Sequence, residues 1–348
     1  MLKIDARGWV KELIGRYTIW CTYQNMYVSH HEPIMMVSED GIPCYDHREL
    51  EKINQHTNSL IAINCLTEGI HSIKWFKQYE KSNHYLIFVN GTWDKDHYDI
   101  GINYDIMNHL FFINIMLDGY FSPNRFSYYL EKEYVFSDKP TIFISTIGMS
   151  RPERAQLVDS LLEKIEYDNY ILKYSGRDIH GSSDGYDCVS FLDDKFNPYE
   201  FIIPEYYHTV SETVPINLFN QAYFNLITET EILYQKAFFL SEKTIKNLFV
   251  GMPFVIVASP HFLKNLKKLG FETYSSLWDE GYDDIEDYDK RCDKIVELCN
   301  NLGAFDWQAH RHELMQIGHK NQLNLLNLNR IADIEFEAME NTVKKISV

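Results

Sequence analysis

The fold is decided between residues 222 and 258, where the chain reads Ala222-Tyr-Phe-Asn-Leu-Ile227, then Ser241-Glu242-Lys243, then Pro253-Phe-Val-Ile-Val-Ala258. The two apolar runs are typical of buried strands in a parallel sheet. Ser241 predicts a helix start, because its hydroxyl can accept a hydrogen bond from an amide of the first turn. Glu242 suits the positive end of that helix, and Gly251 predicts its other end. Strand, helix and strand therefore follow one another with clear start and stop signals.

A similar succession lies upstream, beyond the break at Asp138-Lys-Pro140. Apolar runs at residues 141–145 and 170–174 predict strands. Ser150 predicts the cap of a helix between them, with Pro152 in its first turn. Strand, helix and strand form the βαβ unit of a doubly wound sheet. We therefore place a domain boundary near residue 138.

The chain after residue 258 continues with further signals. Ser259-Pro260 predicts another helix, Gly270 its end, and residues 271–274 a short strand. The acidic stretch at residues 279–289 lacks the Asp-x-Asp-x-Asp-Gly spacing and following Glu of a calcium loop, so we expect a solvated loop there. Helical sequence follows to the end of the chain.

The first half of the chain is also of α/β character. Apolar runs at residues 60–65, 85–89 and 110–115 predict buried strands, and residues 70–81 predict a helix. We divide the chain into residues 1–137, residues 138–305, and a C-terminal helical segment at residues 306–348 that is expected to pack back on the N-terminal domain.

Charge restricts the function. The chain of 348 residues has 33 Lys and Arg against 50 Asp and Glu, a formal net charge of −17. An acidic surface repels phosphate backbones and anionic lipid, which argues against a general nucleic-acid or membrane binder. The net charge does not exclude a local basic cleft, which could be formed by Lys264-Asn-Leu-Lys267-Lys268 or by Arg151 and Arg154.

The cysteines and the apolar segments bear on the compartment. The six cysteines are scattered, without a CxxC pair, so neither a disulfide framework nor a zinc site is indicated. The first residues lack an apolar signal core, and no stretch approaches the roughly 18 apolar residues that span a bilayer. We expect a cytoplasmic protein.

Two short polar segments are the main candidates for chemistry, namely Thr228-Glu229-Thr230 and the helix start Ser241-Glu242-Lys243. A helix start presents free amides and a partial positive charge, which suits a diphosphate. Lys243 would add a full positive charge, and a neighbouring glutamate can accept hydrogen bonds from ribose hydroxyls. The same residues also make an ordinary capped helix with a solvated charge pair, and spacing alone does not separate the two interpretations.

These segments also carry a resemblance to a known family. Residues 223–230 and 239–246, Gly251-Met-Pro-Phe254 and Ser259-Pro260 resemble the donor-binding half of α-1,3-fucosyltransferase-type glycosyltransferases, and more closely their divergent phage and bacterial relatives. The resemblance covers about residues 141–290. Thr-Glu-Thr stands where the better-known members have a Phe-Glu-Asn-Ser-like stretch, and the first half of the chain shows no family signature.

The resemblance implies two facing Rossmann-like domains of the GT-B type, with a nucleotide-diphosphate sugar as donor bound by residues 138–305 and the acceptor on the N-terminal side. Glu242 would then hold the ribose, Lys243 the phosphates, and Glu229 would lie at the donor sugar. Arg154, or otherwise Arg151, would reach the diphosphate from a helix start. A solvated arginine on a helix is the alternative for either. Fucose is not implied, because a pentose or another hexose would serve equally well.

The implied mechanism is a single displacement with inversion, in which a carboxylate of the N-terminal domain deprotonates the acceptor hydroxyl. Asp94 and Asp96 are the candidates, because they follow a predicted buried strand, where open α/β sheets place their active-site loops. A merely polar turn is the alternative. We expect no metal site at His310, His312 and His319, which we assign to surface or interdomain packing, and the need for a divalent metal is left open.

Two questions stay open at this level. The acceptor is either a glycan or a hydroxylated phage DNA base. If it is DNA, the enzyme would be phage-encoded and act in the host cytoplasm. The acidic net charge of the chain disfavours DNA. The alternative to an enzyme is a non-catalytic protein that binds or sequesters a nucleotide or a nucleotide sugar. Walker A, Gly-x-Gly-x-x-Gly and Gly-x-Ser-x-Gly motifs are missing from the sequence. The oligomeric state is not predicted.

Overall fold

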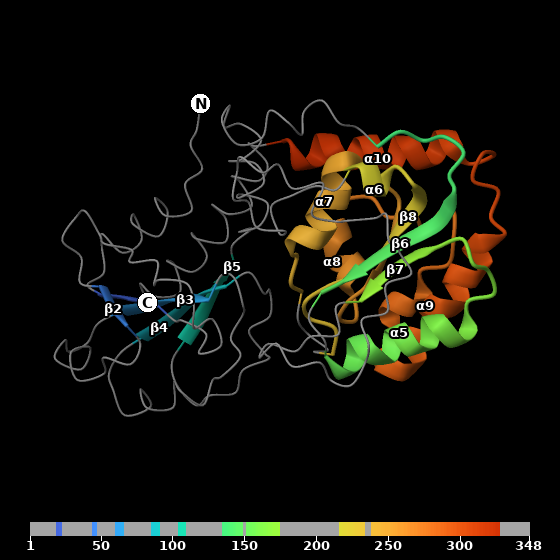
Figure 1. Ribbon diagram of the computed structural model, residues 1–348. Coiled ribbons are helices and arrows are strands. Elements are labelled where there is room, and N and C mark those ends of the chain that lie inside the picture. Colours follow the sequence, from blue (N-terminus) through green and yellow to red (C-terminus); the bar gives the residue numbers. More distant parts are fainter. Residues whose placement is uncertain are drawn as a thin grey trace, which may run out of the picture. The chain divides into compact units, whose positions relative to one another are not determined.

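The structure is a computed structural model, and the part of the chain that it describes comprises residues 134–148, 151–174, 216–233 and 238–327, together with five strands in the first 108 residues whose backbone alone is described. The chain divides into two units, one of Met1–Ile115 with Leu328–Val348 and the other of Met116–Asn327. Each unit contains a parallel sheet (Figure 1). The protein is therefore of mixed α/β class.

The sheet of the first unit has the strand order β2-β1-β3-β4-β5, with every neighbouring pair parallel. Its strands are β1 (Ile19–Thr22), β2 (Cys44–Asp46), β3 (Leu60–Cys65), β4 (Tyr85–Asn90) and β5 (Tyr104–Asn108). The strands predicted at residues 60–65 and 85–89 are confirmed. The others escaped prediction because they are short and carry polar residues, and the predictions at residues 70–81 and 110–115 lie outside the described residues.

The sheet of the second unit has the order β7-β6-β8-β9 and is also parallel throughout. Its strands are β6 (Thr141–Ile147), β7 (Ile171–Tyr174), β8 (Ala222–Thr228) and β9 (Phe254–Val257). All four were predicted from their apolar runs. β9 is buried along its whole length, and β8 at every residue except Tyr223. Such continuous burial is expected of parallel strands covered on both faces.

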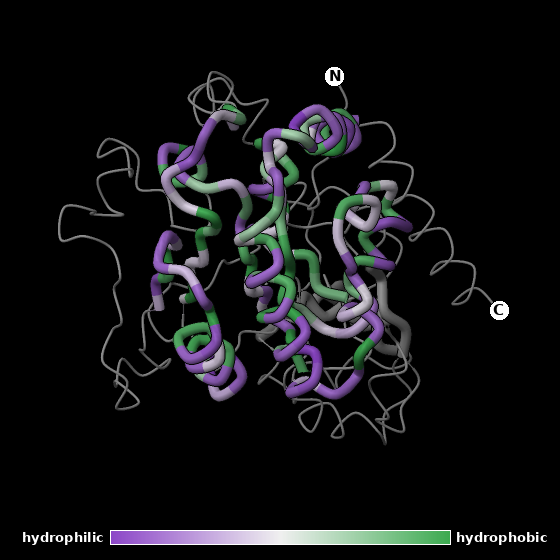
Figure 2. The backbone as a smooth tube through the Cα atoms, turned by 90° about the vertical axis from the view of Figure 1, so that its right-hand side faces the viewer, coloured by the Kyte–Doolittle hydropathy of each residue, from purple (hydrophilic) through white to green (hydrophobic). Residues whose placement is uncertain are grey.

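Helices pack against this sheet, with α5 and α9 on one side and α7 and α10 on the other (Figure 1). In Figure 2 hydrophobic segments run through the middle of the described part, and hydrophilic residues are frequent along the helices around them. The helical elements are α5 (Pro152–Lys164), α6 (Ile216–Phe219), α7 (Glu242–Val250), α8 (Phe262–Lys268), the 3-10 helix η4 (Gly281–Asp284), α9 (Tyr288–Gly303) and α10 (Arg311–Leu325).

The helix boundaries follow the predicted signals with small shifts. α7 begins after Ser241, whose side chain accepts from the Lys243 amide, and ends at Gly251 in the left-handed conformation with φ 73°. α5 begins after Arg151 and not after Ser150, with Pro152 as its first residue. α8 begins after His261, two residues later than Ser259-Pro260 predicted.

Of two predictions after β9, one is wrong and the other holds only in part. Residues 271–274 form no strand, because two of their amides bond to side chains: Glu272 N donates to Asn321 Oδ1 at 2.7 Å and Tyr274 N to Glu280 Oε1 at 2.8 Å. The acidic stretch is a solvated loop only in part, since most of its carboxylates are exposed but the 3-10 helix η4 and the start of α9 lie within it. Asp283 is buried and accepts hydrogen bonds from the amides of Leu263 and Lys264, at 2.9 and 3.1 Å, so it caps α8 from twenty residues away in sequence.

α10 packs against α7 within the second unit, whereas we expected residues 306–348 to pack on the N-terminal domain. Gln322 donates to the carbonyl of Phe249 at 3.0 Å, and Gly318 lies directly against Gly251. The close approach of these two glycines explains the contact, because a side chain at either position would hold the helices apart. Residues 328–348 lie outside the described residues.

Candidate functional site

The candidate site lies at the carboxyl ends of β6 and β8, which are neighbours in the sheet. From β6 the chain leads to β7 on one side, and from β8 to β9 on the other, so the strand order reverses between these two strands. In open α/β sheets, ligands bind in the crevice outside the carboxyl ends of the strands at such a switch point. The start of α5 follows β6, and Glu229 follows β8 directly.

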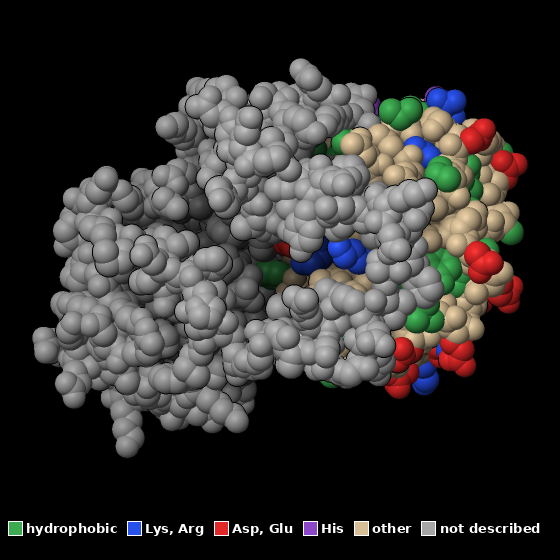
Figure 3. Space-filling view, in the orientation of Figure 1, with side chains coloured by type: hydrophobic (Ala, Val, Ile, Leu, Met, Phe, Trp, Pro, Cys, Tyr) green, Lys and Arg blue, Asp and Glu red, His purple; other side chains and the backbone are tan. Residues whose placement is uncertain are grey.

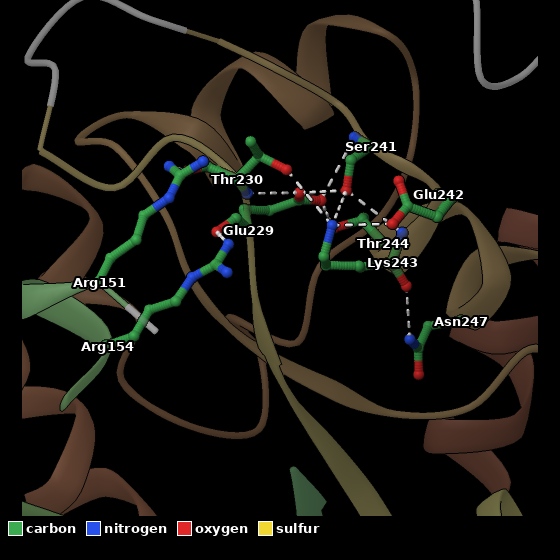
Figure 4. A network of polar contacts seen from close by, with 9 residues as sticks. All are labelled: Arg151, Arg154, Glu229, Thr230, Ser241, Glu242, Lys243, Thr244 and Asn247. Atoms are coloured by element: carbon green, nitrogen blue, oxygen red, sulfur yellow. Dashed lines mark hydrogen bonds and ion pairs between the residues drawn. The ribbon is translucent and has the colours of Figure 1, made fainter. Parts of the chain in front are cut away.

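Two arginines reach this edge from the start of α5 (Figure 4). Arg151 Nη1 donates to the carbonyl of Thr230 at 2.8 Å, and Arg154 Nη2 donates to the carbonyl of Glu229 at 3.1 Å. Arg154 is only 4% exposed, whereas Arg151 is half-buried. Burial, and then the charge of Arg151, lower the pKa of the Arg154 guanidinium, which stays charged at neutral pH. Both arginines therefore hold the loop after β8, and Arg151 is the more accessible.

Glu229 is fully buried at the centre of this loop. Its carboxylate accepts hydrogen bonds from the amides of Thr230, at 3.2 Å, and of Ser241, at 3.4 Å. It also accepts from the hydroxyls of Ser241 and Thr244. Burial raises the pKa of the Glu229 carboxyl, and the nearby Lys243 charge and these hydroxyl donors oppose that rise. The end of β8 and the start of α7 are thus joined through one carboxylate.

Lys243 brings a third positive charge, from the other side of the same loop (Figure 4). Its ammonium donates to Glu242 Oε1 at 2.8 Å, to Thr230 Oγ1 at 3.3 Å and to Ser241 Oγ at 3.4 Å. Burial alone would raise the pKa of Glu242, but the charge and hydrogen bond of Lys243, together with Lys246 and a backbone hydrogen bond, leave the net pKa below the ordinary value. The side chain of Lys243 is 29% exposed and that of Glu242 15%, so both can be reached by a ligand.

The amino end of α7 is largely occupied by groups of the protein itself. The amide of Ser241 bonds to Glu229, and that of Lys243 bonds to the Ser241 hydroxyl at 3.3 Å. Glu242 accepts a hydrogen bond from its own backbone. A diphosphate resting on free amides of this helix, as the sequence led us to expect, would have to displace these contacts. The side chains around the helix start, and not its amides, offer the available positive charge.

Three cations and two carboxylates make up this cluster, so it carries an excess of one positive charge. We call Arg151, Arg154, Glu229, Glu242 and Lys243 the switch-point cluster. In Figure 3 a group of Lys and Arg side chains appears at the centre of the view, while Asp and Glu side chains spread along the outer side of the second unit. In a protein of net charge −17, a local positive excess favours an anionic ligand.

All five donor-side residues singled out from the sequence are thus brought together. Thr230 and Thr244 contribute hydroxyls that the sequence did not assign; Thr244 stands three residues after the cap Ser241, a spacing that places both on one turn of the helix. Asp94 and Asp96 lie outside the described residues. His310, His312 and His319 are exposed, and the described ranges hold no group of three or more side chains suited to a metal ion.

A wider groove, of about 590 Å³, lies between the end of α8, residues 271–276 and α10. Its polar groups already pair with each other: Lys320 with Glu272 at 2.8 Å, and Ser276 with Glu313 at 2.6 Å. It is not at the carboxyl edge of the sheet, so we do not assign the ligand to it.

Comparisons with known proteins add no relative. No protein-family model matches the chain, and a search of curated proteins found no similar sequence. Within the described ranges, no helix combines the length and the apolar character needed to cross a membrane. The functional argument therefore depends on the geometry of the switch-point cluster.

Proposed function

We propose that the protein is a glycosyltransferase that takes a sugar from a nucleotide-diphosphate donor, and that the switch-point cluster binds the donor's diphosphate. One observation carries the proposal: Arg151, Arg154 and Lys243, from the starts of two helices, converge on one loop at the carboxyl ends of β6 and β8. A diphosphate is the anion that such a set of charged donors suits, because each phosphate oxygen accepts charge-assisted hydrogen bonds. The resemblance in sequence adds the sugar.

The half-buried members of the cluster would contact the donor. Lys243 and Arg151 would bind the phosphates, which reverses our sequence-based preference for Arg154, because Arg154 is 4% exposed and already bonded to the carbonyl of Glu229. Glu242 would exchange part of its ion pair with Lys243 for ribose hydroxyls. Arg154 would stabilise the loop after β8 through its hydrogen bond to the carbonyl of Glu229.

In the proposed reaction the acceptor's hydroxyl oxygen attacks the anomeric carbon of the sugar while the bond from that carbon to the diphosphate oxygen breaks. The electron pair of the broken bond stays on the diphosphate, where Lys243 and Arg151 stabilise the new charge. The hydroxyl proton passes to a carboxylate, for which Asp94 and Asp96 are our candidates. The attack from the opposite side inverts the sugar carbon, and two facing Rossmann-like domains would enclose the donor.

A thermal-shift screen tests this proposal, with uridine, guanosine and cytidine diphosphates and their sugars. A ligand that binds only the folded state raises the melting temperature, and at a hundred times its dissociation constant it stabilises by about 2.7 kcal/mol. We expect the nucleotides of one of these three nucleobases to raise the melting temperature of the wild type and to have little effect on that of Lys243→Ala. The matched control is Lys320→Ala, since Lys320 pairs with Glu272 at the surface and lies outside the cluster.

The results separate three interpretations. Stabilisation followed by transfer to a glycan or to a hydroxymethylated DNA duplex supports the enzyme and identifies the acceptor. Binding with no turnover over all acceptors favours the non-catalytic nucleotide-binding protein. If none of the nucleotides shifts the melting temperature of the wild type, the cluster is only structural and the proposal fails.

A further inference from the structure

Glu229 has no lone pair to spare for a ligand. An ionised carboxylate has about four lone-pair sites. The structure supplies four donors to it, namely the amides of Thr230 and Ser241 and the hydroxyls of Ser241 and Thr244. The residue is also 0% exposed. A sugar hydroxyl could reach this carboxylate only by opening the loop and removing one of its present donors.

The same carboxylate orients the groups that hold Lys243. The Ser241 hydroxyl has a single proton, which it uses to donate a hydrogen bond to Glu229. Its oxygen lone pairs can therefore only accept hydrogen bonds from other groups. They accept from the Lys243 amide at 3.3 Å and from the Lys243 ammonium at 3.4 Å. The loop residue after Glu229, Thr230, accepts from the same ammonium at 3.3 Å. A chain of hydrogen bonds therefore runs from the buried carboxylate to the half-buried Lys243 ammonium.

We infer that Glu229 is a positioning residue for the phosphate site and not a sugar ligand: its carboxylate joins the end of β8 to the start of α7 and so fixes Lys243 where the phosphate binds. This inference rests on the proposed function, since it assigns Lys243 to the phosphate. It differs from the role that the sequence resemblance implies for Glu229. It adds Ser241 and Thr244 as the residues through which Glu229 acts.

The test compares two ligands on one variant. In Glu229→Gln the side chain keeps its shape, but one oxygen becomes an NH2 group that carries two donors and accepts nothing, so the network around the Ser241 hydroxyl has to rearrange. A positioning role predicts that the affinities for the nucleoside diphosphate and for the nucleotide sugar fall by the same factor, on the order of tenfold. A direct sugar contact predicts that only the affinity for the nucleotide sugar falls. Calorimetric titrations of both ligands measure this ratio.

A ligand-free measurement keeps the inference testable on its own. Amide hydrogen exchange in the first turn of α7 is expected to become faster in Glu229→Gln and in Thr244→Val. Glu272→Gln is the matched control, because Glu272 is an exposed carboxylate on the same unit that pairs with Lys320. Faster exchange without any nucleotide binding in the wild type would leave the link from Glu229 to α7 standing while removing the proposed function.

Two results would overturn the inference. One is a loss of affinity confined to the nucleotide sugar, which would make Glu229 a sugar ligand after all. The other is a folded Glu229→Gln variant whose exchange at α7 and whose affinity for the diphosphate both match the wild type. Partial rescue by Glu229→Asp, which restores the charge on a shorter side chain, is expected if the charge holds Lys243.

Discussion

The starts of α7 and α8 lie at the same edge of one sheet, and each receives a carboxylate from elsewhere in the chain. At α8, both oxygens of Asp283 accept backbone amides, from Leu263 and Lys264. At α7, Ser241 caps the helix with its own hydroxyl, and the carboxylate of Glu229 accepts from two backbone amides and also from the hydroxyls of Ser241 and Thr244. The first arrangement completes a helix end, and the second holds a cluster of charged side chains.

The charges around the two helix starts separate a structural end from a candidate site. Within the described residues, no arginine donates a hydrogen bond to the start of α8. Nδ1 of His261, the residue before α8, lies 3.0 Å from Oδ1 of the exposed Asp284. Around α7, Arg151, Arg154 and Lys243 outnumber the two carboxylates. A helix start that is only capped needs no such excess of positive charge, so the excess at α7 is the feature on which our proposal of an anionic ligand rests.

The largest expected effect concerns the other end of α7, where α10 supports it. A Cβ added at Gly318 would lie 2.3 Å from the carbonyl oxygen of Gly251 and 3.0 Å from its carbon, and these backbone atoms cannot turn away as a side chain could. Gly318→Ala should therefore lower the free energy of unfolding by about 3 kcal/mol, measured by urea denaturation. Gly148→Ala is the control, because nothing lies within 4 Å of a Cβ there. Equal stability of the two variants would show that α10 does not support α7.

A smaller effect is expected at the start of α8. Asp283→Ala removes two charge-assisted hydrogen bonds to backbone amides and should cost about 2 kcal/mol of unfolding free energy. The nucleotide affinity should stay as in the wild type. Asp284→Ala is the control, since its side chain is 75% exposed and its removal should change stability by less than about 0.5 kcal/mol. Loss of nucleotide binding in Asp283→Ala would erase the distinction between the two helix starts.

The smallest effect is a dependence on pH that the two carboxylates share. Burial raises the pKa of Glu229 above its ordinary value of 4.5 in the folded protein, and that of Asp283 above 3.8. The folded state then binds these protons more tightly than the unfolded state. Their contribution to stability is therefore full below the ordinary pKa and is lost as pH rises through the raised one.

Chemical denaturation of wild type and Glu229→Gln over a pH series measures this contribution. Between pH 4.5 and neutrality the wild type should lose stability relative to the variant, which has no proton to release at this position. A difference between the two that stays constant with pH, or that changes in the opposite direction, would contradict the raised pKa of Glu229.

The sequence predicted the elements of the second unit well because their signals are local. Ser241 and Gly251 mark the two ends of α7, and the apolar run of β8 marks a strand buried on both faces. The proximity of the five residues of the switch-point cluster could also be predicted, since each stands in the first turn of a helix or directly after a strand. Parallel strands then bring those positions to one edge of the sheet.

What the sequence could not supply are the contacts between distant residues. Asp283 caps a helix that begins twenty positions earlier, and Asn321 satisfies the amide of Glu272 in a segment we predicted to be a strand. The burial of Arg154 and Glu229 is likewise a property of the packed loop. Neither residue looks different in sequence from an exposed one, so their supporting roles became visible only in the structure.

The ion pair of Lys243 with Glu242 has a consequence for how a ligand arrives. Because the two internal carboxylates offset most of the cluster's positive charge, the electrostatic field of the site is weak at a distance, and a chain of net charge −17 gives the proposed diphosphate no long-range attraction. A ligand anion must instead displace a carboxylate of the protein, such as that of Glu242, from its cation. Selectivity for the ligand then depends on short-range contacts, namely on how well the bound anion replaces the ion pair between Lys243 and Glu242.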